Sequence, residues 1–373
     1  MIKSIANAVG STQIFSIILI FALLVSLRKQ RDRSFFSLDT SQEIKGFAIL
    51  AVVLSHIGYF LVDDHAFLQP WSTIAGVGVD LFLILSGYGL AVSSLKKDLS
   101  IGQFYKQRLI RLFVPMWISL LIFFVLKYFV LGISYSWPYI LQAFLGIFRT
   151  ADLYQDINSP LWYFTFIIFF YLLFPLVFSK KSPWLSAIAL YLIPWLLLKT
   201  DLYGLSGNLF MYRIHLAAFP LGVLLASIVR ERERFSALWE SIQSRGRAIF
   251  GGKNILGNFI YYLTVFYFLG MFYYFFNNSG VGRGINYEQT ISIITAFSIL
   301  ILFWLKKFDC RFLYFFGVYS YEIYLLHWPI MYSYDIWYSS LPAWLATALY
   351  LFLFIGLGIG MQYIAKQITN RIL

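Results

Sequence analysis

The chain has 373 residues, of which 60% are hydrophobic and only 12% are charged, and its mean hydropathy is +0.74. A soluble domain carries about 25% charged residues, so this composition excludes a soluble enzyme, a disordered chain and a disulfide scaffold. The single cysteine, Cys310, excludes an intramolecular disulfide and a thiolate metal cluster. The sequence therefore predicts an all-α polytopic membrane protein, and its motifs indicate no metal site.

Apolar segments long enough to cross a membrane, which takes about 20 residues, follow one another along the chain. Eleven segments qualify, near 11–27, 44–62, 73–93, 112–131, 161–179, 184–198, 212–229, 257–276, 290–305, 313–332 and 342–364. The short alternating segments of a membrane β-barrel are absent, so we expect helices. The first segment lacks a small-residue cleavage site and is expected to be an uncleaved helix. A shorter apolar piece, 138–148, is expected to be a re-entrant or interfacial element in an outer loop.

The basic residues predict how the chain is oriented. With the N-terminus outside, the loops that face the cytoplasm hold 23 of the 29 Lys and Arg residues, the opposite loops hold five, and Lys127 lies inside a span. Cytoplasmic loops of membrane proteins carry such an excess of positive charge. The C-terminus is then cytoplasmic, and the net charge of +12 indicates contact with anionic lipid rather than nucleic acid.

Ionisable residues inside the membrane are costly and usually functional. Lys45 and His56 are eleven residues apart in one predicted helix, which places them on the same face and about 16 Å apart along the axis. This arrangement suits an elongated anionic substrate that enters from the cytoplasm and reaches the imidazole near the middle of the membrane. A histidine that hydrogen-bonds neighbouring helices, with a lysine that anchors the interface, is an equally simple interpretation.

Asp80 lies in the next predicted helix, at a depth that matches His56. The carboxylate can then orient the imidazole and raise its basicity. Ser86 and Gly87 in the same helix would let a helix or a ligand approach closely. Small residues of this kind are also common where membrane helices simply pack together, which is the alternative interpretation.

Two further elements carry charged or titratable side chains. Arg108 and Arg111 share a helix face at the predicted cytoplasmic entrance and could grip phosphates, although positive-inside charge alone also explains them. Glu322 falls near the middle of its span, with His327 about 7 Å further out on a different face. A buried carboxylate such as Glu322 needs a cation, a polar network or a proton.

Five motifs in order resemble one family. They are Lys45-x10-His56, Gly78-Val-Asp-Leu-Phe82 with Ser86-Gly-Tyr88, Arg108-x-x-Arg111 with Pro115, Ser159-Pro-Leu-Trp162 with Tyr171-Leu-Leu-Phe-Pro175, and Ser320-Tyr-Glu-Ile-Tyr-Leu-Leu-His-Trp-Pro329. Their order resembles membrane acyltransferase family 3, the bacterial integral-membrane O-acyltransferases that modify surface polysaccharides. The resemblance runs from about residue 41 to residue 364.

The resemblance implies an acyl-CoA-dependent O-acyltransferase of the bacterial cell membrane, by default an O-acetyltransferase that uses acetyl-CoA. It implies a cytoplasmic donor and a carbohydrate acceptor at the outer face. His56 matches the family's essential histidine, and Lys45 matches the basic residue that precedes it. Arg108 and Arg111 match the Arg-x-x-Arg pair.

The chain departs from the family pattern in three respects. Residues 41–373 are expected to form the acyltransferase domain, whereas 1–40 form an extra transmembrane helix and a basic loop. No SGNH hydrolase-like domain follows in the sequence, so the chain is expected to transfer the acyl group itself or to pass it to a separate protein. The turn after Trp162 lacks the acidic pattern that many members show.

In the resulting hypothesis His56 acts as general base or as acyl carrier. Asp80 orients it, or Glu322 assists. The CoA phosphates meet Lys45, Arg108 and Arg111, and the residues expected to line the substrate tunnel are Ser86, Tyr88, Trp162 and His327.

Three alternatives stay open on the sequence. They are an exporter of polysaccharide or lipid-linked sugar, a membrane-bound O-acyltransferase of the other fold type that uses His327, and a non-enzymatic acyl-CoA sensor. The acceptor sugar, the acyl chain length and the oligomeric state, including a homo-oligomer, are not readable from residue types.

Overall fold

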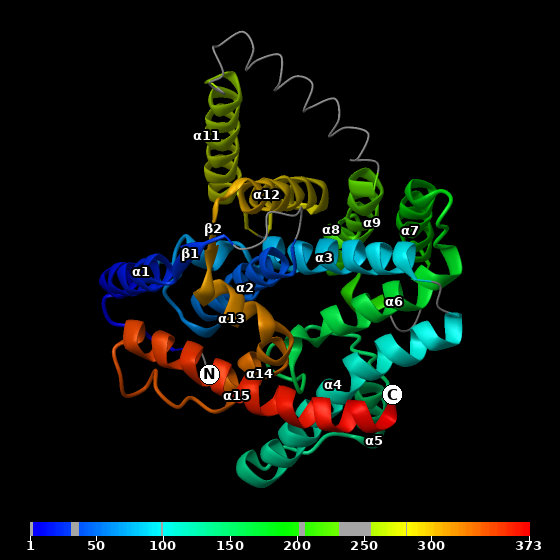
Figure 1. Ribbon diagram of the computed structural model, residues 1–373. Helices are drawn as coiled ribbons and strands as arrows, with labels where there is room; N and C mark the ends of the chain where they lie inside the picture. The colour runs from blue at the N-terminus through cyan, green and yellow to red at the C-terminus, as the bar shows by residue number, and fades with distance from the viewer. Residues whose placement is uncertain (1–2, 31–36, 98–99, 201–205, 231–254, 281) are drawn as a thin grey trace.

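The computed structural model describes residues 3–30, 37–97, 100–200, 206–230, 255–280 and 282–373, and most of them are helical (Figure 1). The longer helices are α1 (Ala8–Val25), α2 (Leu38–Ser55), α3 (Ala75–Lys96), α4 (Ile101–Leu131), α6 (Trp162–Val177), α7 (Pro183–Leu197), α9 (Ala218–Arg230), α11 (Ile255–Asn277), α12 (Ile285–Leu305), α14 (Ser320–Ser333) and α15 (Ala343–Ile372). The shorter helical pieces are α5 (Trp137–Phe144), α8 (Leu209–His215), α13 (Arg311–Val318), η1 (His56–Leu61), η2 (Trp71–Thr73), η3 (Ser159–Leu161) and η4 (Ser206–Asn208). Two strands, β1 (Leu27–Lys29) and β2 (Phe308–Cys310), pair antiparallel with Leu27 opposite Cys310.

Nine helical segments within the described ranges are long and apolar enough to cross a membrane. This confirms an all-α polytopic membrane protein, with fewer spans than the eleven segments predicted. The predicted span 184–198 is the 15-residue helix α7. The predicted span 313–332 is divided, because α13 ends at Val318 and α14 starts at Ser320. Tyr319 between them has a φ of −106° and a ψ of 14°, which are not helical. The apolar piece at 138–148 forms the eight-residue helix α5.

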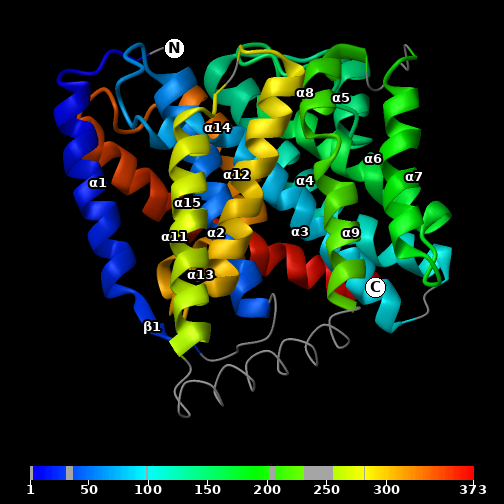
Figure 2. The same cartoon turned by 90° about the horizontal axis from the view of Figure 1, so that it is seen from above.

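The helices run side by side between two ends of the bundle (Figure 2). One end, here called the basic end, holds β1, β2 and the first turn of α2. It also holds Arg230, whose guanidinium donates to Lys180 O, and Lys106, whose ammonium donates to Leu373 O. The orientation of this end toward the cytoplasm stays a prediction. Some of the basic residues on which that prediction depends, namely Arg31, Arg33 and those between 231 and 254, lie outside the described residues.

Helix α2 is the most enclosed of the nine segments, and glycines let its neighbours approach it. A Cβ added at Gly46 would lie 1.8 Å from Leu313 O, and one added at Gly317 would lie 1.7 Å from Gln42 O. The two glycines thus allow α2 and α13 to pack backbone against backbone, as small residues do in membranes. Gly87 on α3 and Gly222 on α9 allow the backbones of these two helices to approach each other in the same way.

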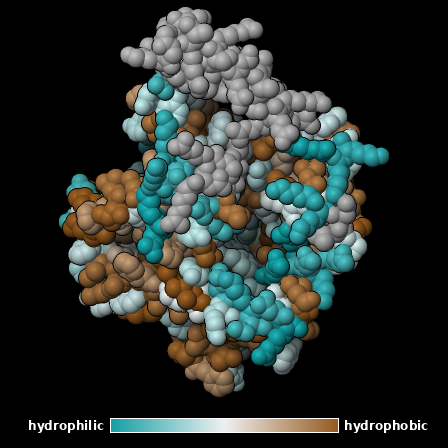
Figure 3. Space-filling model, in the orientation of Figure 1, coloured by the Kyte–Doolittle hydropathy of each residue, from teal (hydrophilic) through white to brown (hydrophobic). Residues whose placement is uncertain are grey.

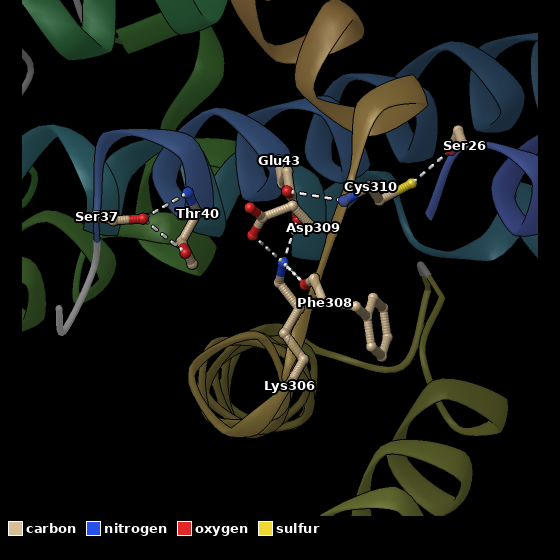
Figure 4. Close-up of polar contacts among 8 residues, drawn as sticks. All are labelled: Ser26, Ser37, Thr40, Glu43, Lys306, Phe308, Asp309 and Cys310. Atoms are coloured by element: carbon tan, nitrogen blue, oxygen red, sulfur yellow. Dashed lines mark hydrogen bonds and ion pairs between the residues drawn. The ribbon is translucent and has the colours of Figure 1, made fainter. Parts of the chain in front are cut away.

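A polar clamp fixes the first turn of α2 at the basic end (Figure 4). Glu43, 1% exposed, accepts hydrogen bonds from the Cys310 N–H at 2.9 Å and from Lys306 Nζ at 2.5 Å. Ser37 caps the same helix by accepting from the Thr40 N–H. Because Lys45 follows Glu43 by two residues, this clamp also sets where the Lys45 side chain begins.

Large apolar side chains cover the outside of the bundle, as a lipid-facing surface requires. On α11 the exposed side chains include Phe259, Tyr262, Phe266 and Tyr273. The face shown in Figure 3 has hydrophobic residues along its left and lower edges and hydrophilic residues across its middle and right.

Candidate active site

A cavity of about 520 Å³ lies inside the bundle and contacts seven of its described α-helices. It extends from Lys45 and Arg108, near the basic end, to Ser279 and Gly280, near the opposite end. Its walls come from α2, α3, α4, α6, α12 and α14, together with α8 and η1. Apolar and aromatic side chains form most of the wall, and a few polar groups converge on it, as is typical of a small-molecule site.

His56 lies on this wall at the point where α2 changes into the π-helical turn η1. Such turns widen the helix by one residue and are frequent at functional sites. Gly58, in the same turn, lies so close to the next loop that an added Cβ would be 2.6 Å from Phe67 O. The π turn and the packed loop together fix the direction in which the His56 ring points.

The His56 ring contacts a second histidine. Nδ1 of His56 lies 2.7 Å from Nε2 of His327, which is fully buried on α14. Nδ1 of His327 lies 3.0 Å from both Ile323 O and Tyr324 O. Carbonyl oxygens only accept hydrogen bonds, so we assign the His327 proton to Nδ1.

This assignment determines the state of His56. Nε2 of His327 is then an acceptor, and His56 must donate from Nδ1. The neutral His56 ring therefore carries a lone pair on Nε2, the nitrogen that the pair leaves available on the cavity side. An imidazole in this state can chemically serve as a base or a nucleophile, and the hydrogen bond to His327 fixes which nitrogen carries the lone pair.

The basic end of the cavity holds two of the three predicted cations. Lys45 and Arg108 both line it, and Lys45 shares the cavity with His56 as their spacing predicts. Arg111 is exposed and is not among the lining residues. Near Arg108, Ser86 and Tyr171 hydrogen-bond at 2.7 Å, and both contribute to the wall.

The four residues expected to line a substrate tunnel divide into two pairs. Ser86 and Trp162 line the cavity. Tyr88 is half-buried and His327 is fully buried, and the cavity wall includes neither. His327 lies behind His56 instead of beside the substrate path.

Asp80 is not the partner of His56, in contrast to the pairing considered from the sequence. Its Oδ1 lies 2.7 Å from Nδ1 of His215, and its Oδ2 accepts from Ser292 Oγ at 2.5 Å. Both oxygens are occupied, and the residue is fully buried. The carboxylate faces α8 and α12 because of its phase on α3.

Glu322 is likewise separate from the cavity. It is 5% exposed and faces Gln362 and Lys366 of α15, and an added Cβ at Gly358 would lie 3.7 Å from its Cβ. The structure does not bring its carboxylate to His56. Its neighbours Tyr321 and Tyr324 line the cavity in its place.

Sequence reasoning missed His215 as a member of the site. His215 lies near the end of a predicted span, but it is 3% exposed and lines the cavity. The available signal was Asp80 itself, since a carboxylate buried in a membrane requires a polar partner. Within the described ranges no three His, Cys, Asp or Glu residues group closely enough to hold a metal.

Comparison with known proteins gives one match. The acyltransferase domain family matches residues 44–363 of the 373, a range that contains the cavity, both histidines of the pair and both cations of the basic end. Searches of curated proteins and of solved structures give no match. The match spans most of the chain and the five motifs lie along it in order, so the chain belongs to membrane acyltransferase family 3.

Proposed function

We propose that this protein transfers an acyl group, acetyl in the simplest case, from acyl-CoA on the cytoplasmic side to a carbohydrate hydroxyl on the outer side of the bacterial inner membrane. Family membership supports an acyltransferase. The donor, the acceptor and the role of His56 are the parts that we add. The lone pair that the histidine pair leaves on Nε2 of His56, at the cavity wall, is the observation that carries this proposal.

Two cations near the basic end of the cavity support an acyl-CoA donor. Lys45 and Arg108 offer the charge-assisted hydrogen bonds that phosphate groups bind. From Lys45 to His56 the helix rises by about 16 Å, so a donor with phosphates at one end and a thioester at the other can reach both. The mostly apolar wall between them suits an extended arm.

His56 would act by one of two balanced routes. As general base, Nε2 takes the proton of the acceptor hydroxyl while its oxygen bonds to the acyl carbon, and the CoA thiolate leaves and receives that proton. As acyl carrier, Nε2 first displaces the CoA thiolate and becomes a positively charged acyl-imidazole. The acceptor oxygen then displaces Nε2, and the hydroxyl proton passes to the freed Nε2 and from there to the thiolate. In both routes His327 accepts from Nδ1–H and stabilises the positive charge that develops on the ring.

The test uses the purified full chain in liposomes with radiolabelled acetyl-CoA. Wild type is compared with His56→Ala and with His65→Ala, an exposed outer-loop histidine that does not line the cavity. Loss of label from CoA in wild type and His65→Ala, but not in His56→Ala, is expected. The labelled product would identify the acceptor, and label trapped on the protein would indicate the carrier route.

Three results would overturn the proposal. Equal turnover in wild type and His56→Ala would reduce His56 to a helix-packing residue. Binding of CoA without turnover in any variant would indicate a sensor, and carbohydrate transport without acyl-CoA would indicate the exporter.

A further inference from the structure

A second histidine lies on the wall of the same cavity, held by a different set of residues. The His215 ring is 3% exposed, and Asp80 and Ser292 hold it in place through a chain of hydrogen bonds. The carboxylate can only accept, so the proton of neutral His215 is on Nδ1 and the lone pair is on Nε2. Among the described residues, none forms a hydrogen bond with this Nε2.

The space beside this ring is kept open. A Cβ added at Gly76 would lie 3.4 Å from Cε1 of His215, and the glycine itself lines the cavity. The Trp162 indole stacks on the imidazole, with ring centroids 5.8 Å apart and planes 21° apart, and also lines the cavity. A hydrogen-bond acceptor beside an aromatic surface suits a ligand with both hydroxyl groups and an apolar face.

The wall around His215 differs in charge from the wall around Lys45 and Arg108, where the acyl donor is proposed to bind. Among the described lining residues, Lys and Arg occur only at Lys45 and Arg108, near the basic end. Away from the basic end the wall has hydroxyl groups of Ser72, Thr73 and Ser279 and the carboxylate of Glu288, which lies one helical turn before Ser292 on α12. Glu288 is bound by the N–H groups of Gly282 and Arg283. A neutral polyol fits these groups, and a phosphate does not.

We infer that His215, positioned by Asp80 and Ser292 and stacked on Trp162, binds the acceptor of the reaction through one hydroxyl of a neutral sugar ring. Asp80 and His56 each lie five residues from the outer end of their helical segments, about 8 Å in each case. A sugar held by His215 therefore lies at the depth of His56. The inference rests on the proposed function for its chemistry, but its sugar-binding part can be tested separately.

The first test compares two reactions of the full chain in liposomes, acetyl-CoA hydrolysis by water and acetyl transfer to a panel of methyl hexopyranosides. His215→Gln keeps a donor for Asp80 and removes the imidazole Nε2. We expect its KM for the glycosides to rise roughly tenfold, as for one lost hydrogen bond. The KM for acetyl-CoA and the hydrolysis rate should stay within about twofold of wild type, whereas His56→Ala loses both reactions.

His65→Gln is the matched control, since this exposed histidine does not line the cavity. Ser292→Ala leaves His215 bound to Asp80 and should raise the glycoside KM less than His215→Gln does. A merely structural role for His215 predicts a different pattern, in which both reactions and the melting temperature fall together while the glycoside KM is unchanged. That pattern would overturn the inference.

The second test needs no turnover. Because Cys310 is the single cysteine of the chain, a newly introduced cysteine can be labelled alone once Cys310 is replaced. In a Cys310→Ser background, Gly76→Cys places a thiol beside His215, and Gly89→Cys places one on the donor side of the wall. Methyl hexopyranosides should slow the reaction of Gly76→Cys with N-ethylmaleimide and leave Gly89→Cys unaffected. Adding His215→Gln should abolish the protection.

The two tests separate the two proposals. If wild type does not turn over acetyl-CoA, the proposed function fails, and protection of Gly76→Cys by a glycoside still supports a sugar site at His215. If no glycoside in the panel protects Gly76→Cys, or CoA alone protects it, the sugar site is wrong whatever the turnover shows.

Discussion

Nδ1 of His56 lies 2.7 Å from Nε2 of His327, and the two imidazole rings are parallel to within 1°. His327 has no place on the cavity wall and acts only through His56. We predict that His327→Ala lowers kcat by about 100-fold, the lower part of the range for a general base, with the KM for acyl-CoA within about twofold of wild type. His327→Gln keeps an acceptor near Nδ1 of His56 and should recover part of the rate. A larger effect on KM than on kcat would contradict the orienting role.

Substitution of Lys45 or Arg108, which line the cavity, should affect acyl-CoA binding more than substitution of the exposed Arg111. We predict that Lys45→Met and Arg108→Met each raise the KM for acyl-CoA by roughly ten- to a hundredfold, since each removes a hydrogen bond between charged groups. Arg111→Met should change it by less than about twofold, because Arg111 is exposed outside the cavity. Initial rates at varied acyl-CoA measure this, and equal effects at Arg108 and Arg111 would show that surface charge alone attracts the donor.

The crossing of α2 and α13 should tolerate no added carbon. An added Cβ at Gly317 meets Gln42 O at 1.7 Å, a backbone atom that cannot move aside. Gly317→Ala should therefore destabilise the fold by about 3 kcal/mol or more. Gly356→Ala on α15, where an added Cβ meets nothing within 4 Å, should be neutral or slightly stabilising. Thermal unfolding in detergent distinguishes the two, and equal melting temperatures would contradict the close approach.

The clamp of Glu43 and Lys306 should be sensitive to loss of either partner. Both side chains are more than nine-tenths buried, so Lys306→Met leaves a buried carboxylate without its cation, at a cost of about 3–5 kcal/mol. The double variant Glu43→Gln/Lys306→Met removes both charges and should recover most of that loss. A double-mutant cycle of melting measurements tests this, and additive effects would show that the two groups act independently.

Asp156, in the loop between α5 and η3, should make stability depend on pH. Burial raises the pKa of its carboxyl above the ordinary value of 3.8, and hydrogen bonds from Thr150 and the Asp152 N–H only partly offset this. Its contribution to stability is complete below the unfolded pKa and is lost as the pH rises through the folded pKa. Asp156→Asn should flatten this part of the melting curve against pH, and an unchanged slope would contradict the assignment.

Much of the architecture could be predicted from the sequence because a bilayer sets the length of a helix that crosses it. Where the predicted spans differ from the observed helices, the difference has a cause that average hydropathy does not report. The break at Tyr319 divides a continuous apolar run, and nothing in the apolarity of residues 313–332 marks it. Helix α7 is mostly apolar, but its 15 residues are fewer than the roughly 20 that a membrane-crossing helix needs.

The site was predictable in part for a related reason. Lys45 and His56 belong to one helix, where spacing alone fixes the relative direction of two side chains. To predict the partners of Asp80 and Glu322, one must know how each helix is rotated relative to its neighbours. That rotation depends on contacts such as Gly87 against Phe219 O and Gly358 against Tyr319. A single sequence does not contain those contacts, so it could place the two acids at the right depth but not on the right side.

The attachment of α1 has a consequence for the order in which the chain assembles. Its ends are held by the pairing of β1 with β2 and by the ion pair of Lys3 with Asp335 at 2.8 Å. Both partners are synthesised about 280 or more residues after the segments that they hold. During biosynthesis α1 can first contact only the segment that follows α2, through bonds such as Lys3 N–H to Leu61 O and Trp71 Nε1–H to Ser16 Oγ. The contacts with β2 and Asp335 must form later, and they close a bundle whose cavity-lining helices are already in the membrane.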